Sequence, residues 1–338
     1  MTMLVTATVM AQEEAPPEAP PPAGPHPALP APKAAQDRLL DIAVAGSRLV
    51  AVGQQGVILT SDDGKTWAQS EAPVGVMLTR VKFADASHGW ALGYDATVLE
   101  TTDAGKTWAV RHYDPEARAL FDVLFLDAQH AIAVGAYGTH LESTDGGRTW
   151  TPKTSVLSDA GAHLNAILKL GDGTLFVAGE RGLLARSADA GATWSLLDSP
   201  YAGSLFGALP RGDKGVLVFG MRGHVYVASD VAACPTVDAA TWDPYARETV
   251  TDPARLTALG WRPIEAPVRE SLFGALTAPS GATLLVGING TMMTLDKDAA
   301  ALALAKGPAR ETIVKAAAFN GRAIAVGRRG AQDVGALP

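Results

Sequence analysis

Four aspartates of this 338-residue chain stand in copies of one short phrase, Ser/Thr-x-Asp-x-Gly-x-Thr-Trp, where x is any residue. They are Asp62, Asp103, Asp145 and Asp189. Carboxylates that converge on one point could ligate a metal ion or supply the acid and base of a glycoside hydrolase. These copies are evenly spaced, because their tryptophans, Trp67, Trp108, Trp150 and Trp194, are 41, 42 and 44 residues apart. Such an interval indicates a structural repeat and places the carboxylates in separate units.

We therefore favour a structural interpretation of the phrase. An aspartate at the start of a tight turn can accept hydrogen bonds from backbone N–H groups two residues on. The glycines Gly64, Gly105, Gly147 and Gly191 allow the positive φ that such a turn needs. The tryptophan rings can pack between neighbouring sheets while their N–H groups find an acceptor. The phrase is predicted to hold one turn per repeat.

A second motif keeps the same interval and consists of an apolar strand that ends in Gly-x-x-Gly. Its first glycines are residues 53, 93, 135, 179, 220, 287 and 327, and the copy at Gly93–Ala96 is degenerate. The step from 220 to 287 is 67 residues long, whereas the other steps are 40 to 44. The excess indicates an insert at about residues 231–260, in a repeat whose tryptophan is Trp261 and whose Asp phrase is lost.

Each repeat is predicted to form four short strands separated by turn residues. In the first repeat we expect strands near Leu39–Ala45, Arg48–Gly53 and Val57–Thr60, and a fourth from Thr66. Four antiparallel strands every 40-odd residues are typical of a propeller blade. The sequence thus predicts an all-β, seven-bladed β-propeller over residues 37–338. The last repeat has room for three strands, and we expect residues before Asp37 to supply the fourth.

The chain before the repeats has a different composition. Residues 1–11 hold a short apolar run ending in Val9-Met10-Ala11, which is typical of a signal-peptidase site, although no basic segment precedes it. We interpret it as a truncated secretion signal, the alternative being a start without fixed structure. Residues 12–36 are rich in Pro and Ala and predict a linker. We therefore expect a periplasmic or secreted protein without a transmembrane span.

Charge and composition argue against several classes of function. The net charge of −7, with no cluster of Lys and Arg among aromatics, argues against binding of nucleic acid. The seven histidines show no metal-ligand spacing, so we expect no metal and no cofactor. The single cysteine, Cys234, has no neighbouring His or second Cys and is not expected to react. We expect a monomer when no partner is bound.

The Asp phrase matches the Asp box of BNR-type propellers, and with the Ala-Val-Gly-x-x-Gly strands it resembles the YCF48/HCF136-like family. The resemblance covers roughly residues 37–338. It implies a secreted or lumenal seven-bladed propeller of a kind known as an assembly factor for photosystem II, with further members in non-photosynthetic bacteria. Members of the family carry an arginine patch on the Gly-x-x-Gly turns. Arg181, Arg222 and Arg329 match that patch, whereas Gln55, Asp95, Tyr137 and Asn289 depart from it.

The Gly-x-x-Gly turns and the links between blades should share one face of the ring, with the Asp boxes on the other. This places Arg181, Arg222 and Arg329, with the adjacent Arg328, opposite the Asp boxes. Arginine suits bidentate capture of carboxylates and is enriched at interface hot spots, so these residues predict partner binding. Simple solvation of loop arginines is the alternative. Tyr94 and Tyr137 lie in the same turns and could add contact area.

The insert at residues 231–260 lies between the third and fourth strands of its blade, so we expect it to project from the Asp-box face. Its Trp242 and Tyr245 could contact a partner, or the insert could be a decoration of this blade.

Asp boxes also occur in sialidases, so a sialidase-like glycoside hydrolase or a carbohydrate-binding propeller is the alternative function. Such enzymes need a Tyr nucleophile with a Glu, or paired carboxylates, and an arginine triad. The chain shows no Phe/Tyr-Arg-Ile-Pro segment before the first box and no blade-specific Tyr–Glu pattern. We predict a non-catalytic scaffold that binds a protein partner in an envelope or integral-membrane complex. In a non-photosynthetic bacterium, that complex would be a transport or export system.

Overall fold

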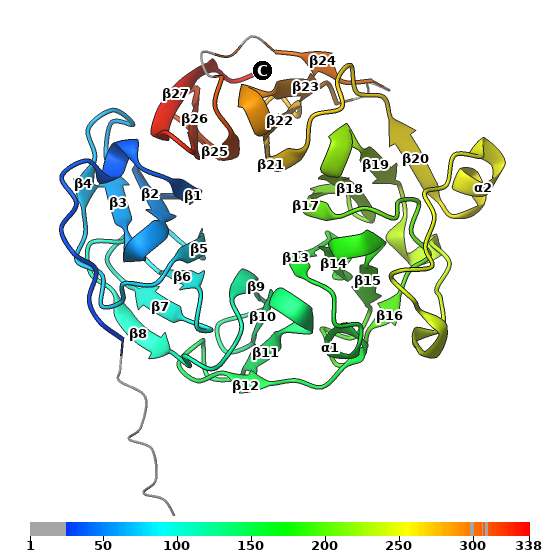
Figure 1. The fold of residues 1–338 in the computed structure, drawn as a ribbon, viewed down its shortest axis with the longest axis horizontal. Helices are drawn as coiled ribbons and strands as arrows, with labels where there is room; N and C mark the ends of the chain where they lie inside the picture. The colour runs from blue at the N-terminus through cyan, green and yellow to red at the C-terminus, as the bar shows by residue number, and fades with distance from the viewer. Residues whose placement is uncertain (1–24, 298–300, 306, 308–309) are drawn as a thin grey trace, which may run out of the picture.

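The computed structural model describes residues 25–338 except 298–300, 306 and 308–309. The described chain forms seven antiparallel sheets, six of four strands and one of three, around a central opening (Figure 1). The all-β class and the seven blades predicted from the repeats are confirmed. We letter the strands of each blade A to D from the opening outward.

The strands have the following bounds. The A strands are β1 (Leu39–Ala45), β5 (Leu78–Phe83), β9 (Leu120–Phe125), β13 (Leu164–Lys169), β17 (Leu205–Arg211), β21 (Leu272–Thr277) and β25 (Ile313–Phe319). The B strands are β2 (Arg48–Gly53), β6 (Gly89–Gly93), β10 (Ala131–Gly135), β14 (Leu175–Gly179), β18 (Gly215–Gly220), β22 (Thr283–Gly287) and β26 (Arg322–Gly327). The C strands are β3 (Ile58–Ser61), β7 (Val98–Thr101), β11 (His140–Ser143), β15 (Leu184–Ser187), β19 (Val225–Ala228), β23 (Met292–Leu295) and β27 (Gly330–Ala336). The D strands are β4 (Ala68–Gln69), β8 (Ala109–His112), β12 (Thr151–Pro152), β16 (Ser195–Leu196), β20 (Trp261–Ile264) and β24 (Ala303–Leu304).

Helical segments are short and lie in the connections. Five of the turns from strand B to strand C are 3-10 turns: η2 (Gln54–Gly56), η3 (Ala136–Gly138), η4 (Glu180–Gly182), η5 (Met221–Gly223) and η8 (Ile288–Gly290). The others are η1 (Ala34–Gln36), α1 (Val156–Asp159), η6 (Val231–Ala233), η7 (Ala239–Thr241) and α2 (Pro253–Ala258).

The core of the protein lies between blades. The B strands are buried along nearly their whole length, because a neighbouring blade covers each face of the sheet. Seven apolar clusters result, and each joins two adjacent blades. One of them closes the ring by packing Leu39 and Leu49 of blade 1 against Phe319 and Val326 of blade 7. Apolar contact between faces therefore holds the circle shut.

The inner strands are also joined by buried polar side chains that reach from one blade to the next. Oδ2 of Asp41 accepts a hydrogen bond from the N–H of Val81 (2.9 Å), and Oδ2 of Asp122 accepts one from the N–H of Ile167 (3.0 Å). Nε of Arg80 lies 3.3 Å from Oδ1 of Asp122. Because buried charges need partners, these groups fix the relative positions of neighbouring blades.

Blade 7 has three strands among the described residues, and the expectation that residues before Asp37 add a fourth is wrong for residues 25–36. The N–H groups of Ala28 and Ala31 instead bond to the Ala72 carbonyl (3.0 Å) and Gln69 Oε1 (2.8 Å) in blade 1. This segment contains four prolines at residues 25, 27, 30 and 32, which cannot donate to a sheet ladder.

Part of the expected linker therefore belongs to the ring. Ala34 in η1 is buried in the cluster between blades 7 and 1, and Ala35 lies against the start of β27 at Gly330. The predicted signal at residues 1–11 and the linker up to residue 24 lie outside the described residues.

Candidate partner-binding face

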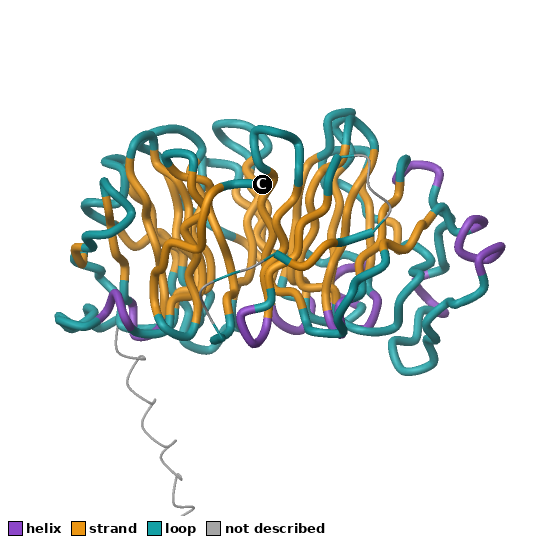
Figure 2. The backbone as a smooth tube through the Cα atoms, turned by 90° about the horizontal axis from the view of Figure 1, so that it is seen from above, coloured by secondary structure: helices purple, strands orange, loops and turns teal. Residues whose placement is uncertain are grey.

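The turns from strand B to strand C lie on one face of the ring together with the links between blades. In blade 5, the N–H of Met221 donates to the carbonyl of Ser204, which stands just before strand A (3.0 Å). The equivalent contact occurs in all seven blades. In the side view, most of the short helical segments lie along one edge of the molecule (Figure 2). We call this surface the B–C face.

The first glycine of each Gly-x-x-Gly turn is required by space. A Cβ atom on Gly220 would lie 2.1 Å from the Ser204 carbonyl oxygen, and the other six first glycines show the same approach at 2.1 to 2.4 Å. The φ of Gly220 is −173°, which any residue adopts, so steric contact alone excludes a side chain. The motif thus fixes the turn, whereas the two residues between its glycines can vary.

Arg181 and Arg222 precede the second glycine of their turns, in the adjacent blades 4 and 5. Both have a left-handed backbone, with φ of 54° and 55°. An ordinary residue pays about 1–2 kcal/mol for this conformation, and Asn and Asp adopt it most readily. Tyr137 and Asn289 hold the same conformation at equivalent positions, so the turn does not need arginine. The two arginines therefore present charges that the fold does not use.

Arg328 and Arg329 lie in blade 7 on the same face, but their turn differs. Gly327 pairs with Gly330 across a two-residue hairpin, and Arg329 lacks the positive φ of Arg181 and Arg222. Their side chains are 69% and 74% exposed and lie 3.8 and 3.4 Å from Glu311. Exposed ion pairs are weak, so this pairing leaves both able to engage a partner. Blade 6, with Asn289, separates them from Arg222.

Tyr94 and Tyr137 lie in blades 2 and 3, where they are 47% and 62% exposed. The guanidinium carbon of Arg118 is 5.2 Å from the centre of the Tyr137 ring, within the range of a cation–π contact. The ring of His163 packs edge-on against Tyr137 at 4.5 Å. Arg118 is a cation of this face that sequence reasoning missed. It stands in the link before β9, and the expectation that links share this face could have found it.

Part of the insert of blade 5 reaches the B–C face, whereas we expected the whole insert on the Asp-box face. After β19 it runs along the outer edge of blade 4, where Thr236 pairs with Leu197 and the N–H of Val237 donates to the Leu196 carbonyl (3.0 Å). Figure 1 shows this segment beside β16 and β20. The reason is that β16 is an outer strand of two residues, whose free edge can pair with a passing segment.

Tyr245 of the insert lies over Arg181. The centre of its ring is 4.1 Å from the guanidinium carbon, and the side chain is 80% exposed. Glu180 also approaches Arg181, at 3.6 Å from Nε. Two blades therefore build the surroundings of Arg181, and Tyr245 is a functional candidate of this face that we had placed on the other.

Arg222 lies at the rim of a cavity of about 490 Å³ between blade 5 and the insert. Stacked rings form one wall, with Tyr201 and His224 at 4.2 Å and His224 and Tyr226 at 5.9 Å. Burial and the charges of Arg269 and Arg222 lower the pKa of His224. The positive charge here therefore belongs to the two arginines, and Arg269 is a second cation that sequence reasoning missed.

The Asp boxes lie on the opposite face, where their own turns engage the carboxylates. Asp145 accepts hydrogen bonds from the N–H groups of Arg148 and Thr149 (3.0 and 2.9 Å) and from the Thr149 hydroxyl (2.6 Å). Asp103 and Asp189 make the equivalent contacts with Thr107 and Thr193. Hydrogen bonds from Thr149 hold the pKa of Asp145 at about 2. Among the described residues, no group of three His, Cys, Asp or Glu could hold a metal ion.

The first Asp box requires a correction, because Asp63 takes the position assigned to Asp62. Oδ1 of Asp63 accepts from the N–H groups of Lys65 and Thr66, both at 2.7 Å, whereas Asp62 pairs with Arg48 at 2.7 Å. Gly64 directly follows Asp63, but in the other boxes one residue separates the aspartate from the glycine. This box is thus one residue shorter, and alignment on Trp67 points to the wrong aspartate.

The box tryptophans pack against the preceding blade. Trp67 lies in the apolar cluster between blades 7 and 1, and Trp108 lies in the cluster between blades 1 and 2. Trp150 lies between blades 2 and 3, and Trp194 lies between blades 3 and 4. Nε1 of Trp108 donates to the Gly105 carbonyl, and Nε1 of Trp150 donates to the Gly147 carbonyl, both at 3.1 Å. The box thereby joins its turn to the interface between blades.

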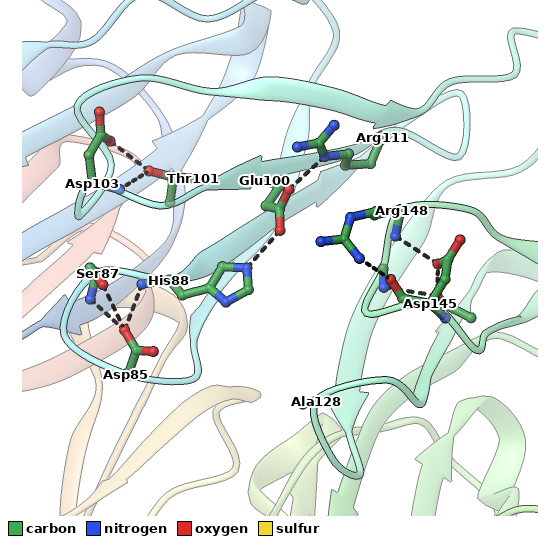
Figure 3. A network of polar contacts seen from close by, with 12 residues as sticks. Asp85, Ser87, His88, Glu100, Thr101, Asp103, Arg111, Ala128, Asp145 and Arg148 are labelled. Carbon is green, nitrogen blue, oxygen red and sulfur yellow. Dashed lines mark hydrogen bonds and ion pairs between the residues drawn. The ribbon is translucent and has the colours of Figure 1, made fainter.

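A polar network in blade 2 lies near the Asp boxes (Figure 3). Glu100 lies 2.7 Å from Nε2 of His88 and 2.6 Å from Nε of Arg111. Burial opposes its ionisation, but the bonds from His88 and Arg111 outweigh burial and lower the pKa of Glu100. A catalytic acid needs a raised pKa, so this carboxylate is suited to a structural ion pair.

Tyr226 and Glu265 both line the cavity at Arg222, and a Tyr with a Glu is the residue pair of a sialidase. Burial raises the pKa of Tyr226 to about 12. An activated tyrosine nucleophile needs the opposite shift. The raised pKa of Tyr226 therefore gives no support to a tyrosine nucleophile at this cavity.

The family described as photosynthesis system II assembly factor YCF48 matches residues 59–119 and 114–250, which is more than half of the chain. The chain belongs to this family. The resemblance inferred from the Asp boxes and the glycine turns is thus confirmed.

Two curated relatives of the YCF48 family illustrate the likeness. The photosystem II assembly protein Ycf48 of a Synechococcus species is 33% identical over 192 residues, which cover 54% of each chain. The photosystem II stability/assembly factor HCF136 of Cyanidioschyzon merolae is 31% identical over 87 residues, 24% of this chain and 20% of that protein. The chain thus spans about half or less of the length of the curated relatives that it matches.

Solved structures of the family share the propeller fold. A structure described as YCF48 bound to D1 peptide has a TM-score of 0.65 at 14% identity and covers 93% of this chain and 100% of that one. YCF48 from Cyanidioschyzon merolae has a TM-score of 0.64 at 15% identity and covers 89% and 96%. The WD40 propeller of Doa1 has a TM-score of 0.63 at 12% identity and covers 89% and 94%. In the part of the chain that the structure describes, no helix is both long and apolar enough to cross a bilayer.

Proposed function

We propose that this YCF48-family propeller is a non-catalytic assembly or accessory factor that binds a protein of a membrane or envelope complex through its B–C face. The observation that carries the proposal is the presence of arginine at two left-handed turn positions, Arg181 and Arg222. Residues that the fold disfavours at an exposed site are expected to serve binding. Arg328 and Arg329 extend the cationic surface to blade 7.

The chemistry of the face favours an acidic segment of a partner protein. Arginine forks bind carboxylates through paired hydrogen bonds, and the exposed rings of Tyr94, Tyr137 and Tyr245 add apolar contact area. The solved relative described as bound to D1 peptide shows that a propeller of this family can take a peptide. The closed ring holds these groups in place before binding, which lowers the entropy cost of association.

The proposal places the protein in the periplasm or outside the cell. In a non-photosynthetic bacterium, the partner would belong to a transport or export complex. Fractionation of native cells, with immunodetection, tests the location. Recovery in the cytosolic fraction alone would contradict it.

Co-purification from detergent-solubilised native membranes tests the docking face. The triple variant Arg181→Ala, Arg222→Ala and Arg329→Ala should lose most of the partner recovered with the wild type. The matched control replaces three exposed cations of the Asp-box face by alanine, namely Lys65, Lys106 and Arg148, and should recover the partner normally. Equal recovery with both triple variants would show that the B–C face is not the docking surface.

A further inference from the structure

A cavity of about 890 Å³ lies at the outer end of blade 5, on the Asp-box side of the ring. It is bounded by β20, by α2 of the insert and by Lys297, which lies just beyond the C strand of blade 6. This is the place where blade 5 has lost its Asp box. In Figure 1, α2 stands outside β20 at the rim of the propeller.

The inner wall of this cavity is apolar. Val227, Leu256 and Trp261 line it, and all three belong to well-packed parts of blade 5 and the insert. Its volume falls within the range of small-molecule sites, which typically combine an apolar wall with a few polar groups that fix orientation. The cavity therefore has the size and the wall of a ligand site.

The polar groups at its edge are cationic. Arg211, Arg262 and Lys297 line the cavity, and the described residues that line it include no carboxylate. None of the three cations forms an ion pair with another described residue. Converging cations without a carboxylate produce a local positive potential that favours an anion, in a protein whose net charge is −7.

Trp261 supplies a second, independent observation. It is 2% exposed and lines the cavity, and its Nε1 has no hydrogen-bond acceptor among the described residues. Trp108 and Trp150 each donate to the glycine carbonyl of their own Asp box. Blade 5 has no Asp box, so Trp261 has no such carbonyl. Nε1 of Trp194 has no acceptor either, so this feature alone does not mark a site. At Trp261 it coincides with a cavity and three cations.

The cationic edge also joins this cavity to a second one of about 360 Å³ between blades 5 and 6. Both are lined by Arg211 and Lys297, and the guanidinium of Arg211 donates to the Lys297 carbonyl. Leu209 and Leu217 line the second cavity. Apolar walls thus lie on both sides of the cations, which suits a ligand with a charged head and an apolar body.

We propose that this cavity is a binding site for a small amphiphilic anion, which places a carboxylate or phosphate head at Arg211, Arg262 and Lys297 and an apolar tail against Trp261 and Leu256. The site lies on the face opposite the proposed docking surface. Its occupancy can therefore be tested independently of any partner.

Titration calorimetry with three probes of equal tail length tests the site: decanoate, decanol and decyltrimethylammonium, all below their micellar concentrations. Decanoate should bind saturably at about one per chain, and the two other probes should bind at least about tenfold more weakly, because they lack the anionic head. The variant with Arg262→Glu and Lys297→Glu should weaken decanoate at least about tenfold, which corresponds to roughly 1.4 kcal/mol. The matched control Arg269→Glu, on the B–C face, should bind decanoate as the wild type does.

Three results would overturn the proposal. These are no saturable binding of decanoate, equal affinity for decanoate and decanol, or unchanged affinity in the variant at Arg262 and Lys297. Both substituted residues are exposed, and a circular dichroism spectrum and melting curve equal to the wild type establish that the variant is folded. Loss of partner recovery in the docking experiment would not affect these outcomes.

Discussion

The ring of Tyr245, in the insert of blade 5, lies 4.1 Å from the guanidinium carbon of Arg181, in a turn of blade 4. A residue in a connection that leaves from the Asp-box side thereby meets an arginine of the B–C face. The insert is thus part of the proposed docking surface, and it restricts the orientation of Arg181. An arginine held in one position loses less entropy when it binds a carboxylate.

The first prediction concerns this pair. Tyr245→Ala should weaken partner binding roughly two- to fivefold, because Arg181 loses a cation–π contact that orients it. Tyr245→Phe keeps the ring and should bind as the wild type does. Affinity measured by biolayer interferometry with the co-purified partner provides the test. In the double variant with Arg181→Ala, the effect of Tyr245→Ala should largely disappear, and full additivity would show that the two residues act separately.

The second prediction distinguishes two neighbouring aspartates. Asp63→Ala removes an acceptor of two backbone N–H groups and of the Thr66 hydroxyl, so it should lower the melting temperature by about 2–4 °C. Asp62→Ala removes an exposed ion pair with Arg48 and should change the melting temperature by less than about 1 °C. Differential scanning calorimetry of both variants is sufficient. A larger loss of melting temperature in Asp62→Ala than in Asp63→Ala would show that Asp62 is the aspartate that holds the turn.

The third prediction is a loss of stability in acid. The pKa values of Asp63, Asp145 and Asp189 are about 2 in the folded protein, held down mainly by hydrogen bonds from their own turns. The unfolded value is near 3.9, so these groups stabilise the fold above about pH 4 and cease to do so as pH falls toward 2. The melting temperature should decline across this window. Asp145→Asn should give a shallower decline, and an identical slope would contradict the assignment.

The fourth prediction tests why the glycine turns recur. Gly220→Ala would place Cβ 2.1 Å from the Ser204 carbonyl oxygen, so we expect a loss of at least about 3 kcal/mol in unfolding free energy, or no folded protein. Gly212→Ala is the matched control. Gly212 has a φ of +69°, and a Cβ added there would meet no atom within 4 Å, so only backbone strain of about 1–2 kcal/mol should result. Urea unfolding measures both, and equal losses would show that close approach is not the cause.

The fold could be predicted from the sequence because its constraints are local and repeated. Gly53, Gly135 and Gly287 each stand where an adjacent carbonyl leaves no space for a side chain, so counting these glycines counts the blades. The B strands that precede them are continuous apolar runs because neighbouring blades cover both faces of each sheet, and this environment repeats around the ring. The strand expected at Arg48–Gly53 has those bounds in the structure.

The features that sequence reasoning missed depend on distant parts of the chain. The path of the insert follows from the free edge of β16, which lies some forty residues earlier. The position of residues 25–36 follows from hydrogen bonds that the N–H groups of Ala28 and Ala31 donate to Ala72 and Gln69 of blade 1. Arg269 joins Arg222 at one cavity although it stands in the link to the next blade. Asp63 was missed for a different reason. The first Asp box is one residue shorter than the others, so an alignment on Trp67 selects Asp62 instead of Asp63.

The two ends of the described chain lie on opposite sides of the disc. His26 and Pro27 approach Gly75, and Ala28 lies beside Gly56 in a turn of the B–C face, whereas Pro338 accepts a hydrogen bond from Ser280 on the Asp-box side (2.8 Å). A purification tag or immobilising support attached at Pro338 would therefore lie on the side opposite the arginines and leave them open to solution. Display of the protein by its carboxyl end is the orientation in which a docking partner can reach it.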